Sequence, residues 1–169
     1  MEEVPYKVTK REIQILINDK PTVKPGYYVY YKCYIDISQK KDNIVYGSIN
    51  ETSGNDINFY VFDQKDFNAW KNGETVRPYV YAKRVKSYTF SFVPDHTDYY
   101  YFVLDNGYSI FTNKVPEIVV MWGYNITVTK YKDVQKTRRV TVYRNVTVTE
   151  YRYINKTRYV SILQLLLGQ

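Results

Sequence analysis

The sequence predicts an all-β protein built around an antiparallel β-sandwich. Three observations lead to this prediction: a composition suited to strands, apolar residues that recur every second position, and frequent turn signals. Tyrosine occurs 21 times in 169 residues, whereas alanine occurs only at Ala69 and Ala82. Tyr, Val, Ile, Phe and Thr suit a pleated surface, and helix-rich chains use much more Ala. Because composition is a weak criterion, the prediction depends mainly on the residue pattern of the individual segments.

The first segment, 27–37, alternates between apolar odd positions and more polar even ones. This period of two is typical of a half-buried strand, and it turns Cys33 inward. Pro25-Gly26 before the segment and the polar stretch 38–43 after it are turn signals. We expect the following side chains to lie mostly inside the sandwich: Val29, Tyr31, Cys33, Ile35, Phe90, Phe92 and Phe102.

Further strands and one helix follow the first strand. Short apolar segments separated by Gly, Asn, Asp or Pro are typical of a sandwich or barrel. A helix is predicted to begin after Asp63 or Asp66 and to end at Gly73, with Phe67 and Trp70 on one face. We expect it across the sandwich edge or closing one end, with Trp70 against the core. The remaining predicted strands are 44–49, 57–62, 79–83, 88–93, 99–104, 108–112 and 117–122.

The chain ends in a repeat, which leads us to divide it into an N-terminal arm (1–19), a sandwich domain (20–122) and a tail (123–169). Residues 125–140 align with 145–160, and nine of the 16 positions are identical. Even positions carry Val, Ile and most basic side chains, whereas odd positions carry Thr, Tyr and Asn, so the tail is predicted to be extended. Two copies are too few for a solenoid. We expect a long hairpin or stalk, or strands added to a neighbour.

The net charge of +7 is concentrated in the tail. Residues 125–160 contain nine basic and two acidic residues, and the rest of the chain is neutral. A row of Lys and Arg is a common protection for strand edges against aggregation, which is our first interpretation. An acidic surface partner comes next, and nucleic acid comes last. The candidates for binding a polyanion are Lys130, Lys132, Lys136, Arg138, Arg144, Arg152, Lys156 and Arg158.

The sequence contains no recognisable enzyme machinery, and we expect neither a cofactor nor a bound metal. No phosphate-binding loop, nucleophile elbow or dinucleotide fingerprint occurs. His96, the single histidine, lies in Pro94-Asp-His-Thr-Asp98 and is interpreted as a turn residue, because zinc usually needs more nitrogen or sulfur ligands. Asp56, Asp63 and Asp66 offer oxygen ligands for calcium, but strand-start and helix-cap roles explain them more simply.

Exposed tyrosines offer the better binding hypothesis. Tyr28, Tyr30 and Tyr34 share the outward face of the first strand, and Tyr99-Tyr-Tyr101 must present a ring on each face. Such rings stack on sugars or anchor a protein partner, although they also serve ordinary cross-strand packing. With Trp70, the three outward tyrosines of the first strand are the candidate ligand-binding residues.

Four glycosylation acceptor sequences favour an extracytoplasmic location. They begin at Asn50, Asn125, Asn145 and Asn155, more than chance predicts for this composition. The start MEEVPYKVTK lacks the apolar stretch of a signal peptide, and the apolar run 162–168 is too short to cross a membrane. We therefore expect no membrane span within this chain.

Three segments together resemble a known group of β-sandwich modules. Gly54-Asn-Asp-Ile-Asn-Phe-Tyr-Val-Phe-Asp63, Phe67-Asn-Ala-Trp70 and Tyr99-Tyr-Tyr-Phe-Val-Leu-Asp-Asn106 resemble GOLD-like and pre-peptidase C-terminal-like domains of secreted prokaryotic proteins. The resemblance covers about residues 20–122 and implies a jelly-roll-like core. The tail resembles Thr/Tyr/Val repeats of archaeal surface proteins. GOLD-domain trafficking proteins normally have a disulfide and a membrane helix, and the lone Cys33 excludes an intramolecular disulfide here.

The resemblance implies non-catalytic interaction, such as adhesion, assembly or cargo contact. We expect a structural or interaction module on the surface of an archaeal cell or one of its viruses. Its partner would be a protein, another copy engaged through the tail strands, or a glycan or other anionic surface. The alternative from another class is a nucleic-acid-binding protein that uses the basic segment 125–160.

Overall fold

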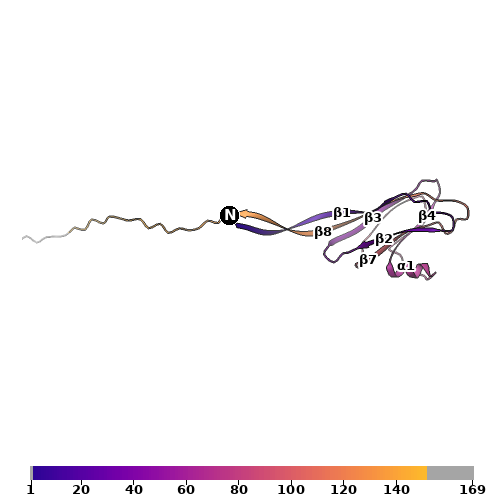
Figure 1. Cartoon of the computed structure of the whole chain (residues 1–169), viewed down its shortest axis with the longest axis horizontal. Coiled ribbons are helices and arrows are strands. Elements are labelled where there is room, and N and C mark those ends of the chain that lie inside the picture. Colours follow the sequence, from indigo (N-terminus) through magenta and orange to yellow (C-terminus); the bar gives the residue numbers. More distant parts are fainter. Residues whose placement is uncertain (1, 152–169) are drawn as a thin grey trace, which may run out of the picture. The chain divides into compact units, whose positions relative to one another are not determined.

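The structure is a computed structural model that describes residues 2–151. It contains two antiparallel four-stranded sheets packed against each other and one short helix (Figure 1). The chain divides into a compact unit that ends at Val134 and a second unit that begins at Gln135. The strands are β1 Glu2–Asp19, β2 Tyr28–Ile35, β3 Lys41–Glu51, β4 Ile57–Asp63, β5 Val80–Val85, β6 Ser87–Phe92, β7 Asp98–Asp105 and β8 Pro116–Val134; the helix is α1 Gln64–Lys71.

The strand pairing defines a jelly roll. One sheet has the order β1-β8-β3-β6 and the other β2-β7-β4-β5. Within them, β1 pairs with β8, β2 with β7, β3 with β6 and β4 with β5, all antiparallel. The four strands of the second half thus pair with the four strands of the first half in reverse order. This is the topology of a long antiparallel hairpin folded into two sheets. The predicted fold class is confirmed.

The core lies between the inner faces of the two sheets. Odd-numbered residues of β2 point inward, as the alternation predicts. Of the expected core residues, Ile35, Phe90, Phe92 and Phe102 are buried, and the others are half-buried against them. Cys33 is among the half-buried ones, and burial raises the pKa of its thiol to about 11.

The predicted strand 108–112 is wrong. This segment is a loop. The Asn106 side chain, which precedes it, donates hydrogen bonds to the backbone oxygens of Thr112 (2.8 Å) at its end and of Val23 (3.1 Å). The Tyr108 hydroxyl donates to the backbone oxygen of Asp56 at 2.7 Å. Because these contacts draw the segment into a compact turn, it cannot extend beside another strand.

The predicted boundary at residue 122 falls inside β8, which continues to Val134. Its register with β1 runs from Asp19 opposite Ile118 to Glu2 opposite Val134. β3 pairs with β8 only as far as Asn125. Beyond that point β1 and β8 form a two-stranded ribbon that projects from the sandwich (Figure 1). The N-terminal arm and the first part of the repeat therefore belong to the compact unit.

The tail shows less regular structure than predicted. Residues 135–151 form neither helix nor strand. The expected pairing of the two repeats with each other is not seen there; instead, the first repeat pairs with β1. The end of the second repeat, residues 152–160, lies outside the described residues.

Helix α1 lies on the outer face of the β2-β7-β4-β5 sheet, so the predicted placement across the sandwich edge or closing one end is wrong. Asp63 caps it by accepting a hydrogen bond from the Asp66 backbone nitrogen at 2.7 Å. Phe67 and Trp70 pack onto that face against Phe62 and Tyr101, and a second small core results. This explains why β4 is apolar on both faces. Among residues 2–151, no helix is long and apolar enough to cross a membrane.

Candidate functional site

The outer face of the β2-β7-β4-β5 sheet carries tyrosines from every strand, and we call it the aromatic face. The predicted residues Tyr28, Tyr30 and Tyr34 all lie there, 39%, 48% and 55% exposed. Tyr99 on β7 and Tyr81 on β5 are also exposed on this face. The sequence analysis thus placed the β2 tyrosines correctly, but it did not identify Tyr81 as their neighbour.

Helix α1 covers one part of this face and leaves another part open. Trp70 lies against Tyr28, with 5.0 Å between ring centroids, and stacks on Phe62. Trp70 therefore completes the small core more than it offers a free ring. In the open part, Tyr34 and Tyr99 contact each other at 5.0 Å, and the Lys32 ammonium lies 4.1 Å from the Tyr99 ring.

A groove of 310 Å³ lies beside the helix. Its apolar wall includes Tyr60, Trp70 and Tyr81, and its polar groups include Glu74 and Thr75. Apolar rings with a few polar groups are typical of a site that binds a small ring or an extended side chain. The groove and the open pair Tyr34 and Tyr99, which does not line it, are the two parts of the aromatic face that are accessible to a ligand.

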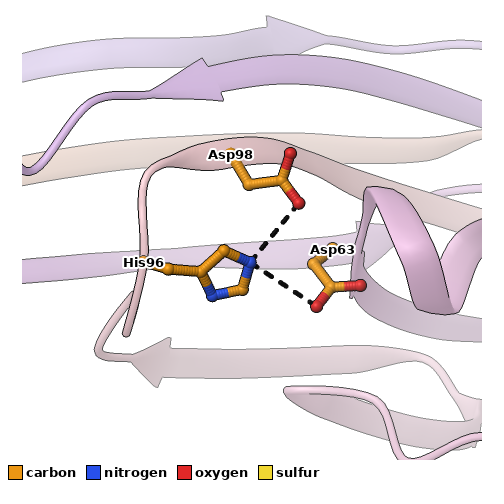
Figure 2. A group of neighbouring side chains, drawn as sticks. All are labelled: Asp63, His96 and Asp98. Carbon is orange, nitrogen blue, oxygen red and sulfur yellow. Dashed lines mark hydrogen bonds and ion pairs between the residues drawn. The ribbon is translucent and has the colours of Figure 1, made fainter.

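A second candidate site lies where β4 ends and β7 begins. Asp63 is the last residue of β4, His96 lies in the loop that precedes β7, and Asp98 is the first residue of β7 (Figure 2). The His96 Nε2 atom is 3.4 Å from Asp98 Oδ2 and 3.7 Å from Asp63 Oδ2. One ligand atom from each residue lies within 4.8 Å of the others.

The other ring nitrogen of His96 also forms a hydrogen bond. Nδ1 lies 2.7 Å from Asp95 Oδ1, and the Tyr79 hydroxyl donates a hydrogen bond to the same oxygen. The bond to Asp95 is the largest influence that raises the pKa of His96, with Asp98 and Asp63 adding to it. The bond from Tyr79 holds the pKa of Asp95 below its usual value.

The sequence analysis did not find this cluster. It treated His96 as a turn residue and Asp63 as a helix cap, and the cap is confirmed. Asp63 lies 33 positions before His96, and only the pairing of β4 with β7 brings them together. One signal was available: Asp63 follows one predicted strand, Asp98 precedes another, and antiparallel neighbours place such positions at the same end.

The alternative calcium cluster is not assembled. Asp56 forms an ion pair with Arg84 at 2.6 Å and accepts a hydrogen bond from the Tyr108 hydroxyl at 2.8 Å. The cluster of Asp63, His96 and Asp98 described above includes neither Asp56 nor Asp66. Asp56 directly precedes β4, Asp63 caps α1, and Asp66 lies in the first turn of the helix.

The acceptor asparagines differ in their surroundings. Asn50 and Asn145 are exposed. Asn125 is half-buried, and its amide nitrogen donates a hydrogen bond to Asp42 Oδ2 at 2.6 Å. Asn155 lies outside the described residues. Within the described range, Asn50 and Asn145 are thus the accessible acceptors.

The basic candidates fall in two regions. Lys130 and Lys132 are exposed on the β1–β8 ribbon. Lys136, Arg138 and Arg144 are exposed in the segment that follows Val134. Arg152, Lys156 and Arg158 lie outside the described residues.

Comparison with known proteins identifies no family. No protein-family model matches the chain, and no curated protein matches it. The resemblance to GOLD-like and pre-peptidase C-terminal-like domains stays a prediction. The fold alone defines the class, a jelly-roll β-sandwich with an aromatic outer face.

Proposed function

We propose that this protein is a non-catalytic interaction module of a cell or virion surface and that the aromatic face binds its partner. The observation that carries the proposal is the group of exposed tyrosines on one face of one sheet. Tyrosine rings are large and rigid, so they bury apolar area at little entropic cost. The rings in question are Tyr28, Tyr30, Tyr34, Tyr81 and Tyr99.

The same sheet face provides an internal comparison. Under α1, Tyr101 is 4% exposed and Val103 is fully buried. On the open part, Tyr34 is 55% and Tyr99 41% exposed. Tyr34 and Tyr99 contact each other across the two strands, but this contact leaves much of both rings exposed to solvent. An apolar patch that the fold leaves open is typical of an interaction surface.

A saccharide is the partner chemistry that this surface fits best. Sugar rings stack on flat aromatic rings, and polar groups such as Glu74 and Thr75 in the groove can bind hydroxyls. Jelly rolls include lectin domains, but fold alone does not assign a function. The exposed acceptor Asn145 supports an extracytoplasmic location. Protein from its native source should then be heavier than 20.2 kDa by intact-mass spectrometry.

Binding to immobilised saccharides tests the proposal. We expect the double variant Tyr34→Ala/Tyr99→Ala to lose at least about tenfold in affinity, the effect of removing two ring contacts. Binding should change little between low and high salt, because the contacts are apolar. The control is Tyr131→Ala, because Tyr131 is a tyrosine on the ribbon, away from the aromatic face, and is 63% exposed.

Two results would contradict the proposal. One is equal binding by the wild type and the double variant. The other is no measurable binding to any saccharide of the panel. Circular dichroism of the variants shows whether they fold, and both substituted rings lie outside the main core, so folding should be retained.

A further inference from the structure

Three ligand atoms converge at the junction of β4, α1 and β7. We propose that Asp63, His96 and Asp98 bind one divalent transition-metal ion, for which Zn²⁺ is the probe. The three side chains approach a common point from two strand ends and a loop (Figure 2). This inference is independent of the aromatic face, so either proposal can fail without the other.

The spacing of the donors suits a metal ion. The His96 Nε2 atom lies 3.4 Å from one carboxylate oxygen and 3.7 Å from the other. Tetrahedral coordination with metal–ligand distances of about 2.0–2.2 Å places neighbouring ligand atoms about 3.3–3.6 Å apart. The two separations from Nε2 are close to this spacing, and the two carboxylate oxygens, which lie within 4.8 Å of each other, would move together around an ion.

The carboxylates around the site favour a bound cation. Asp63 and Asp98 have side chains only 14% and 25% exposed, so water screens them incompletely. Within the described residues, the ion pairs of Asp63, Asp95 and Asp98 all involve His96. One imidazole cannot balance three carboxylates, whereas a divalent ion together with the ring would come much closer.

The remaining atoms of these ligands are already held by the fold. Asp63 Oδ1 accepts from the Asp66 backbone nitrogen at 2.7 Å, and Asp98 Oδ1 accepts from the Tyr99 backbone nitrogen at 2.7 Å. In both carboxylates the second oxygen, Oδ2, faces His96, and Asp98 Oδ2 also accepts a hydrogen bond from the Gln64 backbone nitrogen at 3.3 Å. The ligand atoms are thus oriented before any ion arrives.

Asp95 acts as a positioning residue for the imidazole. When Nδ1 donates its proton to Asp95, 2.7 Å away, the neutral ring directs its Nε2 lone pair toward Asp63 and Asp98. Metal-bound histidines almost always have such a partner on the other nitrogen. Two carboxylate oxygens that face Nε2 require a positive charge there, which either a proton on the ring or a metal ion that replaces it can supply.

The donor set selects among ions, and the site is open to solvent. One imidazole nitrogen with two carboxylate oxygens suits Zn²⁺ better than Ca²⁺ or Mg²⁺, which prefer oxygen ligands only. A cavity of 500 Å³, which Lys65, Arg77 and Tyr79 also line, adjoins Asp63 and His96. A fourth ligand, either water or a group of a bound partner, can enter from this side.

The single histidine makes the test direct. In ¹⁵N-labelled full-length protein without an affinity tag, His96 gives the only imidazole signals. We expect one equivalent of Zn²⁺ to shift the Nε2 resonance while Nδ1 stays protonated. Titration calorimetry should show one Zn²⁺ site per chain, and Ca²⁺ and Mg²⁺ should not compete for it. Coordination through Nδ1, or an unchanged imidazole spectrum, would overturn the proposal.

Variants separate coordination from simple charge attraction. His96→Gln and Asp98→Asn should each weaken Zn²⁺ binding by at least about tenfold, and Asp95→Asn by about 10–100-fold through loss of orientation. Asp66→Asn is the matched control, because it removes a carboxylate beside the site that is not a ligand. Asp63 is left intact because it caps α1. Equal Zn²⁺ affinity in wild type and His96→Gln would rule the site out.

Discussion

Glu51 shows how one residue connects three parts of the sandwich. Its carboxylate is 6% exposed and lies at the end of β3. It accepts hydrogen bonds from the Ser53 hydroxyl (2.6 Å) and from the backbone nitrogens of Asn55 (2.8 Å) and Val115 (2.6 Å). Burial opposes ionisation, but these bonds outweigh it and hold the pKa of Glu51 below its usual value.

Replacing this carboxylate should destabilise the fold. In Glu51→Gln, the side-chain NH2 group would replace one carboxylate oxygen and face N–H donors that it cannot accept from. We therefore expect the free energy of unfolding at pH 7 to fall by about 2 kcal/mol. A lowered folded-state pKa means that this stabilisation is present above the unfolded-state pKa of about 4.3 and is lost as pH falls through the folded value. The wild type should therefore lose more stability than the variant on acidification.

Urea unfolding at pH 7 and in acid measures this difference. Glu117→Gln is the control, because Glu117 pairs with Lys20 on the surface, where both side chains are 49% exposed. Its effect should stay below about 1 kcal/mol. A Glu51→Gln protein as stable as the wild type at pH 7 would show that the hydrogen bonds contribute nothing net.

At the scale of elements, the ribbon formed by Glu2–Arg11 and Asn125–Val134 is the feature that stands apart. β3 leaves β8 at a bulge near Asp42, whose φ of 50° is left-handed. Arg11 donates a hydrogen bond to the Asp42 backbone oxygen at 2.8 Å, and Asn125 bonds the Asp42 carboxylate. This network fixes the base of the ribbon to the sandwich.

Truncation tests which part of the chain the sandwich needs. A two-stranded ribbon is only marginally stable in water, so it should depend on its base. We expect a chain ending at Val134 to keep the full stability of the sandwich. A chain ending at Tyr124 should still fold, but amides of residues 2–11 should exchange rapidly in hydrogen–deuterium exchange. Loss of the whole fold on ending at Tyr124 would show that the ribbon is part of the folding unit.

At the scale of the molecule, the charge distribution separates the proposed function from its alternative. The +7 excess lies in residues 125–160, while the aromatic face belongs to a neutral part of the chain. A polyanion bound by the basic side chains of this segment would release counterions, so its affinity would fall steeply with salt. Stacking on the aromatic face would depend little on salt.

We therefore predict weak binding of random-sequence DNA and RNA at about 150 mM salt, with dissociation constants above the micromolar range. A salt titration by fluorescence anisotropy measures this. The control is a chain that ends at Val134, which should bind no more weakly than the full chain if the tail is not a nucleic-acid site. Sub-micromolar binding that is lost on replacing Lys130, Lys132, Lys136 and Arg138 would make nucleic acid the leading partner.

The sequence alone determined the local features of this protein. Alternation in β2 established which side chains face the core, because successive side chains on a strand point to opposite faces. Asp63 and Gly73 bounded the helix, because a carboxylate satisfies free N–H groups at its start and glycine adopts the left-handed backbone after its end. These signals act over a few residues, and a single sequence displays them.

Only the tertiary structure decided which distant segments meet. β1 and β8 carry similar Val, Thr and Tyr patterns, yet nothing local shows that Glu2 lies opposite Val134 instead of the two repeats pairing with each other. Helix α1 packs on one part of the outer sheet face, and this packing determines which tyrosines stay exposed. It depends on contacts with residues from several strands. The approach of Asp63 to His96 and Asp98 likewise follows from β4 pairing with β7. Strand pairing is chosen by long-range packing, because a period of two fits many partners equally well.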